Sequence, residues 1–134
     1  PGMGVLDITT LPQGHRAIGE LVTVPLVEGL TQPLSGFENH GGGTVLGEDA
    51  APLGRVISGV GNGTPQGQVP AEVAYDGAVQ GSIIATYMHG PALTRNPELA
   101  DLLLQRATGM SLPPLEVPGV AQLRTERLSG VQLP

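Results

Sequence analysis

The chain of 134 residues contains no cysteine, which excludes disulfide bonds, thiolate metal sites and a cysteine nucleophile within these residues. Aromatic residues are almost absent, since only Phe37, Tyr75 and Tyr87 occur, so the core must consist of Val, Leu, Ile and Ala. Basic residues are also few: 6 stand against 12 acidic residues, which gives a net charge of −6. Without a basic patch or an aromatic stacking surface, nucleic-acid binding is not expected.

Long apolar runs are missing too, and none reaches the roughly 18 residues of a membrane span. The first residues, Pro1 to Gly4, have neither the charged region nor the apolar stretch of a signal peptide, and they lack an initiating Met. We therefore expect a fragment or a processed product, and the lack of cysteine fits a cytoplasmic protein. In contrast, 21 Gly and 13 Pro are many, and they predict turns, short strands and few long helices in one domain.

Apolar patterning predicts a strand-rich chain with one clear helix. The helix is expected to begin at Asn96 and Pro97, a capping residue followed by a proline suited to the first turn, and to end at Gly109. Asp76-Gly77 lies between two β-prone runs and predicts a hairpin turn. Residues 111–134 are Pro-rich and are expected to form an extended tail, disordered in part or packed on a partner. Strands are expected at 4–9, 18–27, 33–40, 44–46, 52–60, 71–75 and 78–88, with a loop at 10–15.

His89 closes the most apolar run of the chain, which begins at Ser82, and Gly90-Pro91 follows it directly. A strand here would deliver the imidazole to a sheet edge, where active sites of α/β proteins collect. His89 is therefore a candidate general base. The alternative is a histidine at a strand end that only bonds to backbone.

Glu38 and His40 form a second candidate pair, because strand alternation places them on one face. They could ligate a metal or act as an acid–base couple, although two ligands make only half a metal site. A buried, hydrogen-bonded pair that braces the following run Gly41-Gly42-Gly43 is the more common arrangement. The glycine-rich segment 59–63 lacks the ending of a phosphate-binding loop and indicates a plain turn.

Arg16 and Asp7 remain ambiguous from the residues alone. An arginine can bind both oxygens of a carboxylate, but an arginine in a loop is more commonly solvated. Asp7 follows a short apolar run with no clear partner. Ser35, Ser58 and Ser82 lack the Gly-x-Ser-x-Gly setting of a serine hydrolase.

Taken together, these segments resemble class I glutamine amidotransferases of the cobyric acid synthase type, and most closely the GatD branch. The resemblance covers roughly residues 2–104, and the motifs stand in family order. They are Gly2-Met3-Gly4-Val5-Leu6-Asp7, Gly36-Phe37-Glu38-Asn39-His40-Gly41-Gly42, Pro52-Leu53-Gly54, Gly59-Val60-Gly61-Asn62, Thr86-Tyr87-Met88-His89-Gly90-Pro91 and Arg95-Asn96-Pro97-Glu98-Leu99-Ala100-Asp101.

The resemblance implies the C-terminal, strand-rich half of a flavodoxin-like α/β domain at residues 1–110, followed by the tail 111–134. It implies a glutaminase that releases ammonia from glutamine to a MurT-like, ATP-dependent ligase subunit, which amidates the glutamate of lipid II. His89 matches the family's general base and Arg16 its glutamine anchor, and no cofactor is implied. The family's cysteine lies N-terminal to the Gly-x-Gly-Leu-Leu-Asp segment, where this chain starts.

Pro91 stands where typical members have a glutamate two residues after the histidine, and an aspartate of the ligase partner is expected to replace it. Two alternatives stay open: a cobyrinate-type amidotransferase, and a non-catalytic module that retains the fold. A half-domain would expose a sheet edge and an apolar face, so self-association of the isolated chain is expected.

Overall fold

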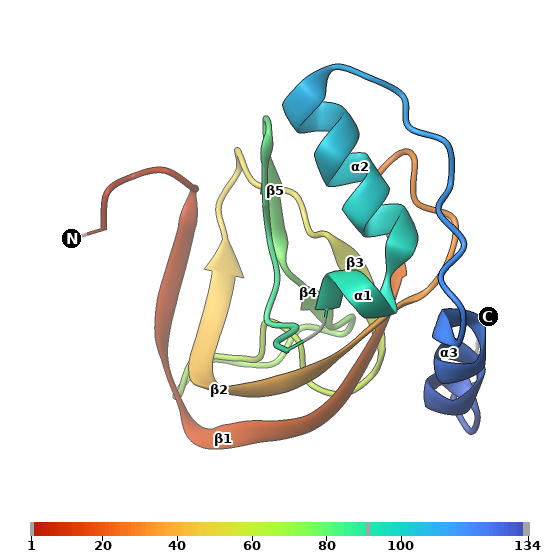
Figure 1. Cartoon of the computed structure of the whole chain (residues 1–134). Coiled ribbons are helices and arrows are strands. Elements are labelled where there is room, and N and C mark those ends of the chain that lie inside the picture. Colours follow the sequence, from red (N-terminus) through yellow and green to blue (C-terminus); the bar gives the residue numbers. More distant parts are fainter. Residues whose placement is uncertain (1, 91, 133–134) are drawn as a thin grey trace.

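The computed structural model describes residues 2–90 and 92–132. Two antiparallel sheets are present, a larger one with strand order β2-β1-β3-β4 and a smaller one that pairs β5 with β6 (Figure 1). The described elements are β1 (Ile8–Pro25), β2 (Leu34–Leu46), β3 (Gly54–Ser58), β4 (Tyr75–Asp76), β5 (Ala78–Gln80), β6 (Ile83–Ala85), α1 (Ala92–Arg95), α2 (Pro97–Thr108) and α3 (Val120–Leu128). The strand-rich α/β class expected from the sequence is confirmed.

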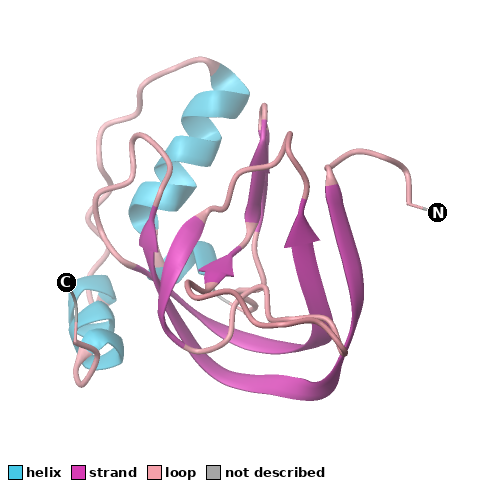
Figure 2. Ribbon diagram, turned by 180° about the vertical axis from the view of Figure 1, so that it is seen from behind, coloured by secondary structure: helices cyan, strands magenta, loops and turns pink. Residues whose placement is uncertain are grey.

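Strands β1 and β2 form a long, curved antiparallel ribbon that dominates the molecule (Figure 2). The loop predicted at residues 10–15 is wrong, because these residues belong to β1. The loop-like composition of residues 10–15 nevertheless reflects an irregularity in the strand, since the pairing register shifts between Pro12 and Ala17. Residues 13–16 of β1 face the single residue Gly41 of β2 there, which is a β-bulge that bends the ribbon.

The hydrophobic core lies where the first part of β2 meets β1, β3 and α2. Its buried members are all aliphatic or sulfur-containing, as the shortage of aromatic residues required: Leu21, Leu30, Leu34, Leu53, Met88 and Leu99. Alternation over residues 36–41 of β2 buries Glu38 and His40 and exposes Phe37 and Asn39, as predicted for this pair. The core thus fixes which face of β2 each side chain occupies.

Helix α2 begins after Asn96 with Pro97 in its first turn and ends before Gly109, as predicted. Gly109 has a φ of 70°, a left-handed conformation that favours glycine. The Asn96 side chain does not cap the helix. Its amide instead exchanges two hydrogen bonds with the backbone of Ser35, so it ties the start of α2 to β2.

The hairpin predicted at Asp76-Gly77 is wrong. Asp76 ends β4, which pairs with β3, whereas β5 pairs with β6 across Gly81-Ser82. The reason is burial: Asp76 is fully buried, and its carboxylate accepts hydrogen bonds from Thr86 and Tyr87. The single strand predicted over residues 78–88 is also wrong in part, because these residues form two short paired strands, β5 and β6, and β6 ends at Ala85.

The extended tail predicted for residues 111–134 is wrong in part, because it contains helix α3. Arg124 of α3 donates hydrogen bonds to the carbonyl oxygens of Arg95 and Pro33, at 2.6 and 2.9 Å, and thereby docks the helix. None of the α3 residues is fully buried. The last two residues of the predicted tail, 133–134, lie outside the described residues, and the domain boundary at residue 110 stays a prediction.

Candidate functional site

His89 lies beside an edge strand, but not at the end of a strand as predicted, because β6 ends at Ala85. Strand β2 is the outer strand of the larger sheet, and His89 forms an isolated antiparallel bridge with Phe37. The His89 N–H donates a hydrogen bond to the Phe37 carbonyl oxygen at 2.7 Å. The side chain of His89 is exposed, so its ring is available to a reactant, while its backbone is held by β2.

Arg16 projects from the β-bulge of β1, a feature that redirects side chains next to active sites. Its Nε–H donates a hydrogen bond to the Asn39 Oδ1 atom at 2.7 Å. The guanidinium is exposed, and neither of its two terminal nitrogens makes a hydrogen bond or ion pair within the described residues. The bulge and Asn39 thus orient an arginine fork that is free to receive a carboxylate.

Arg16 and His89 share one face of the sheet. Residues opposed in an antiparallel pair place their side chains on the same face, so His89 lies on the face of Phe37. Asn39 is two residues further along β2, about 7 Å away, and is exposed on that face too. A cation and an imidazole therefore stand beside the segment 37–39, although the role of each stays a prediction.

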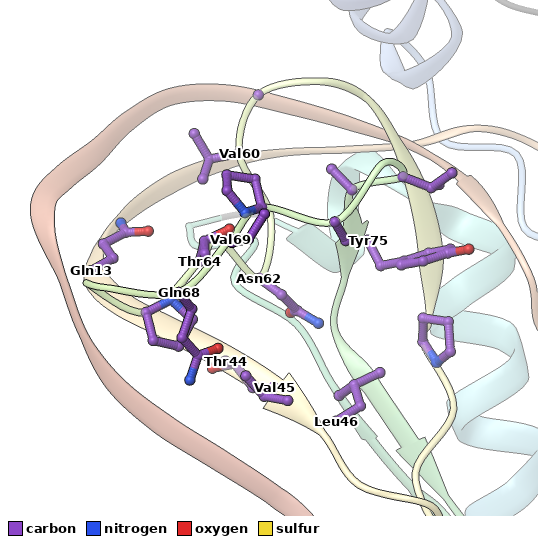
Figure 3. Close-up of a pocket in the computed structure, with 18 of the residues that line it drawn as sticks. Gln13, Thr44, Val45, Leu46, Val60, Asn62, Thr64, Gln68, Val69 and Tyr75 are labelled. Carbon is purple, nitrogen blue, oxygen red and sulfur yellow. The ribbon is translucent and has the colours of Figure 1, made fainter.

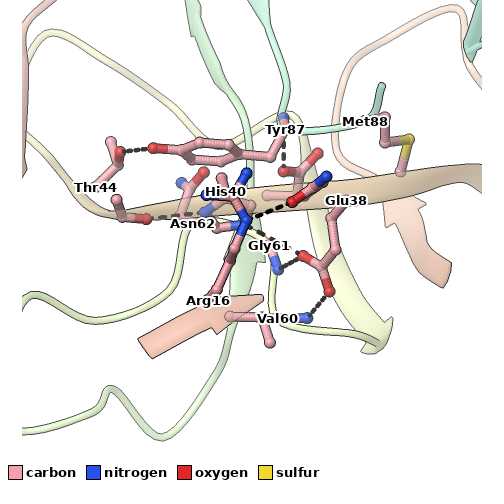
Figure 4. Close-up of polar contacts among 12 residues, drawn as sticks. Arg16, Glu38, His40, Thr44, Val60, Gly61, Asn62, Tyr87 and Met88 are labelled. Atoms are coloured by element: carbon pink, nitrogen blue, oxygen red, sulfur yellow. Dashed lines mark hydrogen bonds and ion pairs between the residues drawn. The ribbon is translucent and has the colours of Figure 1, made fainter. Parts of the chain in front are cut away.

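The opposite face of this segment carries a buried polar cluster (Figure 4). The Glu38 carboxylate accepts hydrogen bonds from the N–H groups of Val60 and Gly61, at 2.7 and 2.9 Å. The His40 ring lies between Glu38 and the Gly42 carbonyl oxygen, and it stacks on the Tyr87 ring with 3.8 Å between centroids. This is the hydrogen-bonded bracing pair that the sequence analysis weighed against a metal site.

A second buried carboxylate, Asp76, holds the segment that leads to His89. It accepts hydrogen bonds from the Thr86 hydroxyl and the Tyr87 N–H. Burial raises the pKa of the Asp76 carboxyl above its ordinary value, and the Thr86 and Tyr87 hydrogen bonds oppose that rise in part. This role was not predicted from the sequence, because Asp-Gly is also a strong turn signal.

The segment 59–63 is a turn whose amides serve the protein itself. Two of its N–H groups are taken by Glu38, so an internal carboxylate fills the position that a phosphate would occupy. Asn62 anchors the end of the segment through two side-chain hydrogen bonds to the backbone of Gly77. The interpretation as a plain turn agrees with this geometry.

A cavity of about 830 Å³ opens between β2, the β-bulge and the segment 59–75 (Figure 3). Its walls are mainly Val, Pro and Ala, with the polar side chains of Gln13, Asn62 and Gln68 among them. Neither Arg16 nor His89 lines it. The cavity is therefore separate from the face that carries the two candidate residues.

Three further observations complete the site. Within residues 2–90 and 92–132, no group of three or more His, Asp or Glu side chains is arranged to hold a metal ion. No helix in the same ranges has the length and hydropathy needed to cross a membrane. Pro91, two residues after His89, lies outside the described residues.

Comparison with known proteins gives a consistent picture. Residues 1–97 match the model of the CobB/CobQ-like glutamine amidotransferase domain. The chain is 32% identical over 130 residues to the lipid II isoglutaminyl synthase (glutamine-hydrolyzing) subunit GatD of Staphylococcus aureus, covering 95% of this chain and 49% of the relative. It is 37% identical over 107 residues to GatD of Streptococcus pneumoniae, covering 79% of this chain and 38% of the relative.

A cobyric acid synthase from Pelotomaculum thermopropionicum is 40% identical over 98 residues, covering 67% of this chain and 17% of that protein. The chain thus spans about half the length, or less, of the curated relatives that it matches. The family match covers most of the chain, including β1, β2, the bulge and His89. The chain belongs to the CobB/CobQ-like glutamine amidotransferase family.

Proposed function

We propose that the protein carrying these residues is a glutaminase subunit that hydrolyses glutamine to glutamate and ammonia. The observation that carries the proposal is the shared face of Arg16 and His89, with the His89 backbone fixed on β2 and Arg16 oriented by Asn39. The two GatD relatives, named as subunits of a glutamine-hydrolyzing lipid II isoglutaminyl synthase, support it.

The chemistry assigns one role to each residue. Arg16 binds the α-carboxylate of glutamine through its free guanidinium nitrogens. His89 takes the proton of a cysteine thiol, and the thiolate attacks the side-chain amide carbon. The C–N bond breaks, His89 returns the proton to the departing ammonia, and a thioester remains. Water then attacks the thioester while His89 takes its proton, which releases glutamate and restores the cysteine.

The cysteine must come from outside these 134 residues, since they contain none. Glutamine hydrolysis therefore requires the natural protein, which contains these residues together with the cysteine. We propose further that the ammonia passes to a MurT-like, ATP-dependent ligase subunit, which amidates the glutamate of lipid II and supplies an aspartate that orients His89. A cytoplasmic location and self-association of the isolated chain also stay predictions.

Glutamate release by that protein, in complex with its ligase partner, tests the roles. His89→Ala should lower kcat by about 1,000-fold or more, because base and acid are both lost. His15→Ala, at another exposed histidine, should retain activity. Arg16→Ala should raise the KM for glutamine at least tenfold, whereas Arg106→Ala on α2 should leave it unchanged. Full activity of the His89 variant would show that His89 is not the general base, whereas absence of glutamate release by the wild-type protein would support the non-catalytic module.

The cobyric acid synthase relative supports a second acceptor. Its 40% identity exceeds that of either GatD relative, although over a shorter stretch. In that case ammonia would amidate carboxylates of a cobalamin precursor. Glutamine-dependent amidation of lipid II without amidation of a cobyrinate substrate would support the first function, and the reverse result would support the second.

A further inference from the structure

The His40 ring occupies a fully constrained position beneath the proposed active face. Its Nδ1 atom lies 3.0 Å from the Gly42 carbonyl oxygen, and its Nε2 atom lies 3.4 Å from Glu38 Oε2. Both partners are hydrogen-bond acceptors, and each of them faces one nitrogen of the ring. His40 is 7% exposed and Glu38 2% exposed, so water competes little for these contacts.

One face of the same ring is covered by Tyr87. The two rings stack with an interplanar angle of 22°, and the Tyr87 hydroxyl shares a hydrogen bond of 2.7 Å with the Thr44 hydroxyl. Glu38, His40 and Thr44 thus form one rigid seat for the Tyr87 side chain, which we call the Tyr87 seat.

Tyr87 is separated from His89 by a single residue. Met88 is buried, and the His89 N–H is held by Phe37, the residue before Glu38. The Tyr87 seat and the bridge to Phe37 therefore fix both ends of the short segment 87–89 on the same stretch of β2. The segment lies beyond the end of β6, so no ladder within the smaller sheet holds it.

We propose that His40 is a positioning residue for His89: together with Glu38 it holds Tyr87, and through Tyr87 it sets where the His89 imidazole stands on the exposed face of β2. The inference rests on the proposed function, because its effect is measured as the rate of glutamine hydrolysis with His89 as the general base. In this proposal Glu38 and His40 act by positioning another side chain. They neither bind a metal nor transfer a proton to the substrate. His40 itself lies on the buried face, away from Arg16.

The test uses the natural protein with its ligase partner and measures kcat and KM for glutamine hydrolysis. His40→Gln removes the stacked ring and its contact with Glu38, and should lower kcat about tenfold or more while KM changes less than about twofold, since Arg16 is untouched. Tyr87→Leu removes the seated ring and should behave in the same way. Tyr87→Phe keeps the ring over His40 and should retain clearly more kcat than Tyr87→Leu.

Thermal unfolding of each variant separates misplacement from loss of fold, and kcat is compared per folded molecule. Equal kcat in wild type and His40→Gln, a loss confined to KM, or equal kcat in the two Tyr87 variants would overturn the proposal. If His40→Gln does not fold, the comparison of kcat between Tyr87→Leu and Tyr87→Phe tests the positioning role instead. His89→Ala, measured in parallel, reports on the proposed function alone: if it stays active, the function fails, independently of the His40 result.

Discussion

Gly36→Ala should displace the segment that carries His89. Gly36 is buried in β2, and a Cβ atom added there would lie 2.5 Å from the Cβ of Met88, 2.6 Å from its Cγ and 3.1 Å from its Sδ. Ordinary contact begins at 3.4 Å, so Met88 must retreat by about 0.9 Å, the difference between 3.4 Å and 2.5 Å. The Met88 Cβ belongs to the backbone-proximal part of the residue, so rotation of the side chain cannot relieve the overlap.

The magnitude follows from that displacement. Overpacking of a core costs about 1–3 kcal/mol of unfolding free energy. A shift of about 1 Å in a catalytic group can cost about 100-fold in rate, so we expect kcat for glutamine hydrolysis to fall by about that factor.

The assay is chemical denaturation together with glutamate release, on the natural protein that carries these residues. Gly41→Ala is the matched control on the same strand, because the nearest atom to its added Cβ is the His15 carbonyl oxygen at 3.9 Å. If the Gly36 and Gly41 variants have the same stability and the same kcat, the close approach of segment 86–89 to β2 is wrong.

Three further predictions concern buried charge and the tail. Burial raises the pKa of Asp76, so the contribution of this group to stability is full below the ordinary pKa of 3.8 and is lost as pH rises through the raised pKa. The free energy of unfolding of Asp76→Asn, measured by denaturation at a series of pH values, should therefore rise relative to wild type as pH approaches neutral. Partial burial would raise the pKa of Glu98, but hydrogen bonds from the Thr31 hydroxyl and from the N–H groups of Gln32 and Thr31 outweigh it and lower the pKa. Its stabilisation is present above pH 4.5 and is lost as pH falls through the lowered pKa, so the deficit of Glu98→Gln should shrink in acid. Relative to wild type, the stabilities of the two variants should therefore change with pH in opposite directions, and a change in the same direction would contradict at least one of the two assignments. Arg124→Ala should release α3, with loss of amide protection over residues 120–128 and a cost of about 1–3 kcal/mol; unchanged hydrogen exchange there would show that other contacts dock the helix.

Local patterns in the sequence predicted what depends on neighbouring residues. Alternation placed Glu38 and His40 on the buried face of β2, and helix signals at Asn96 and Gly109 marked both ends of α2. The apolar run before His89 predicted a strand that ends at the imidazole. The strand β6 ends earlier, at Ala85, but His89 still pairs with Phe37 of the edge strand β2. In each case a period or a terminal residue carries the information directly.

Contacts between distant segments were beyond such patterns. Asp76 looked like a turn residue because its partners, Thr86 and Tyr87, become visible only when β4 and the segment after β6 meet. Helix α3 was missed because its sequence is only weakly amphipathic and follows the Pro-rich stretch 113–118. Its docking depends on Arg124, which bonds to carbonyl groups far away in the chain. The bulge at residues 13–16 has loop-like composition and was therefore predicted as a loop. The residues of β1 before and after it both pair with β2, which only the folded structure shows.

The central claim is that His89 generates ammonia from glutamine on the face it shares with Arg16. The most direct measurement compares two nitrogen sources in the complete complex with its ligase partner, where the amidated product is followed with glutamine or with ammonium chloride. For His89→Ala we predict loss of glutamine-driven amidation by about 1,000-fold, with ammonium-driven amidation at the wild-type rate. Equal loss with both sources, or retention with glutamine, would contradict the account.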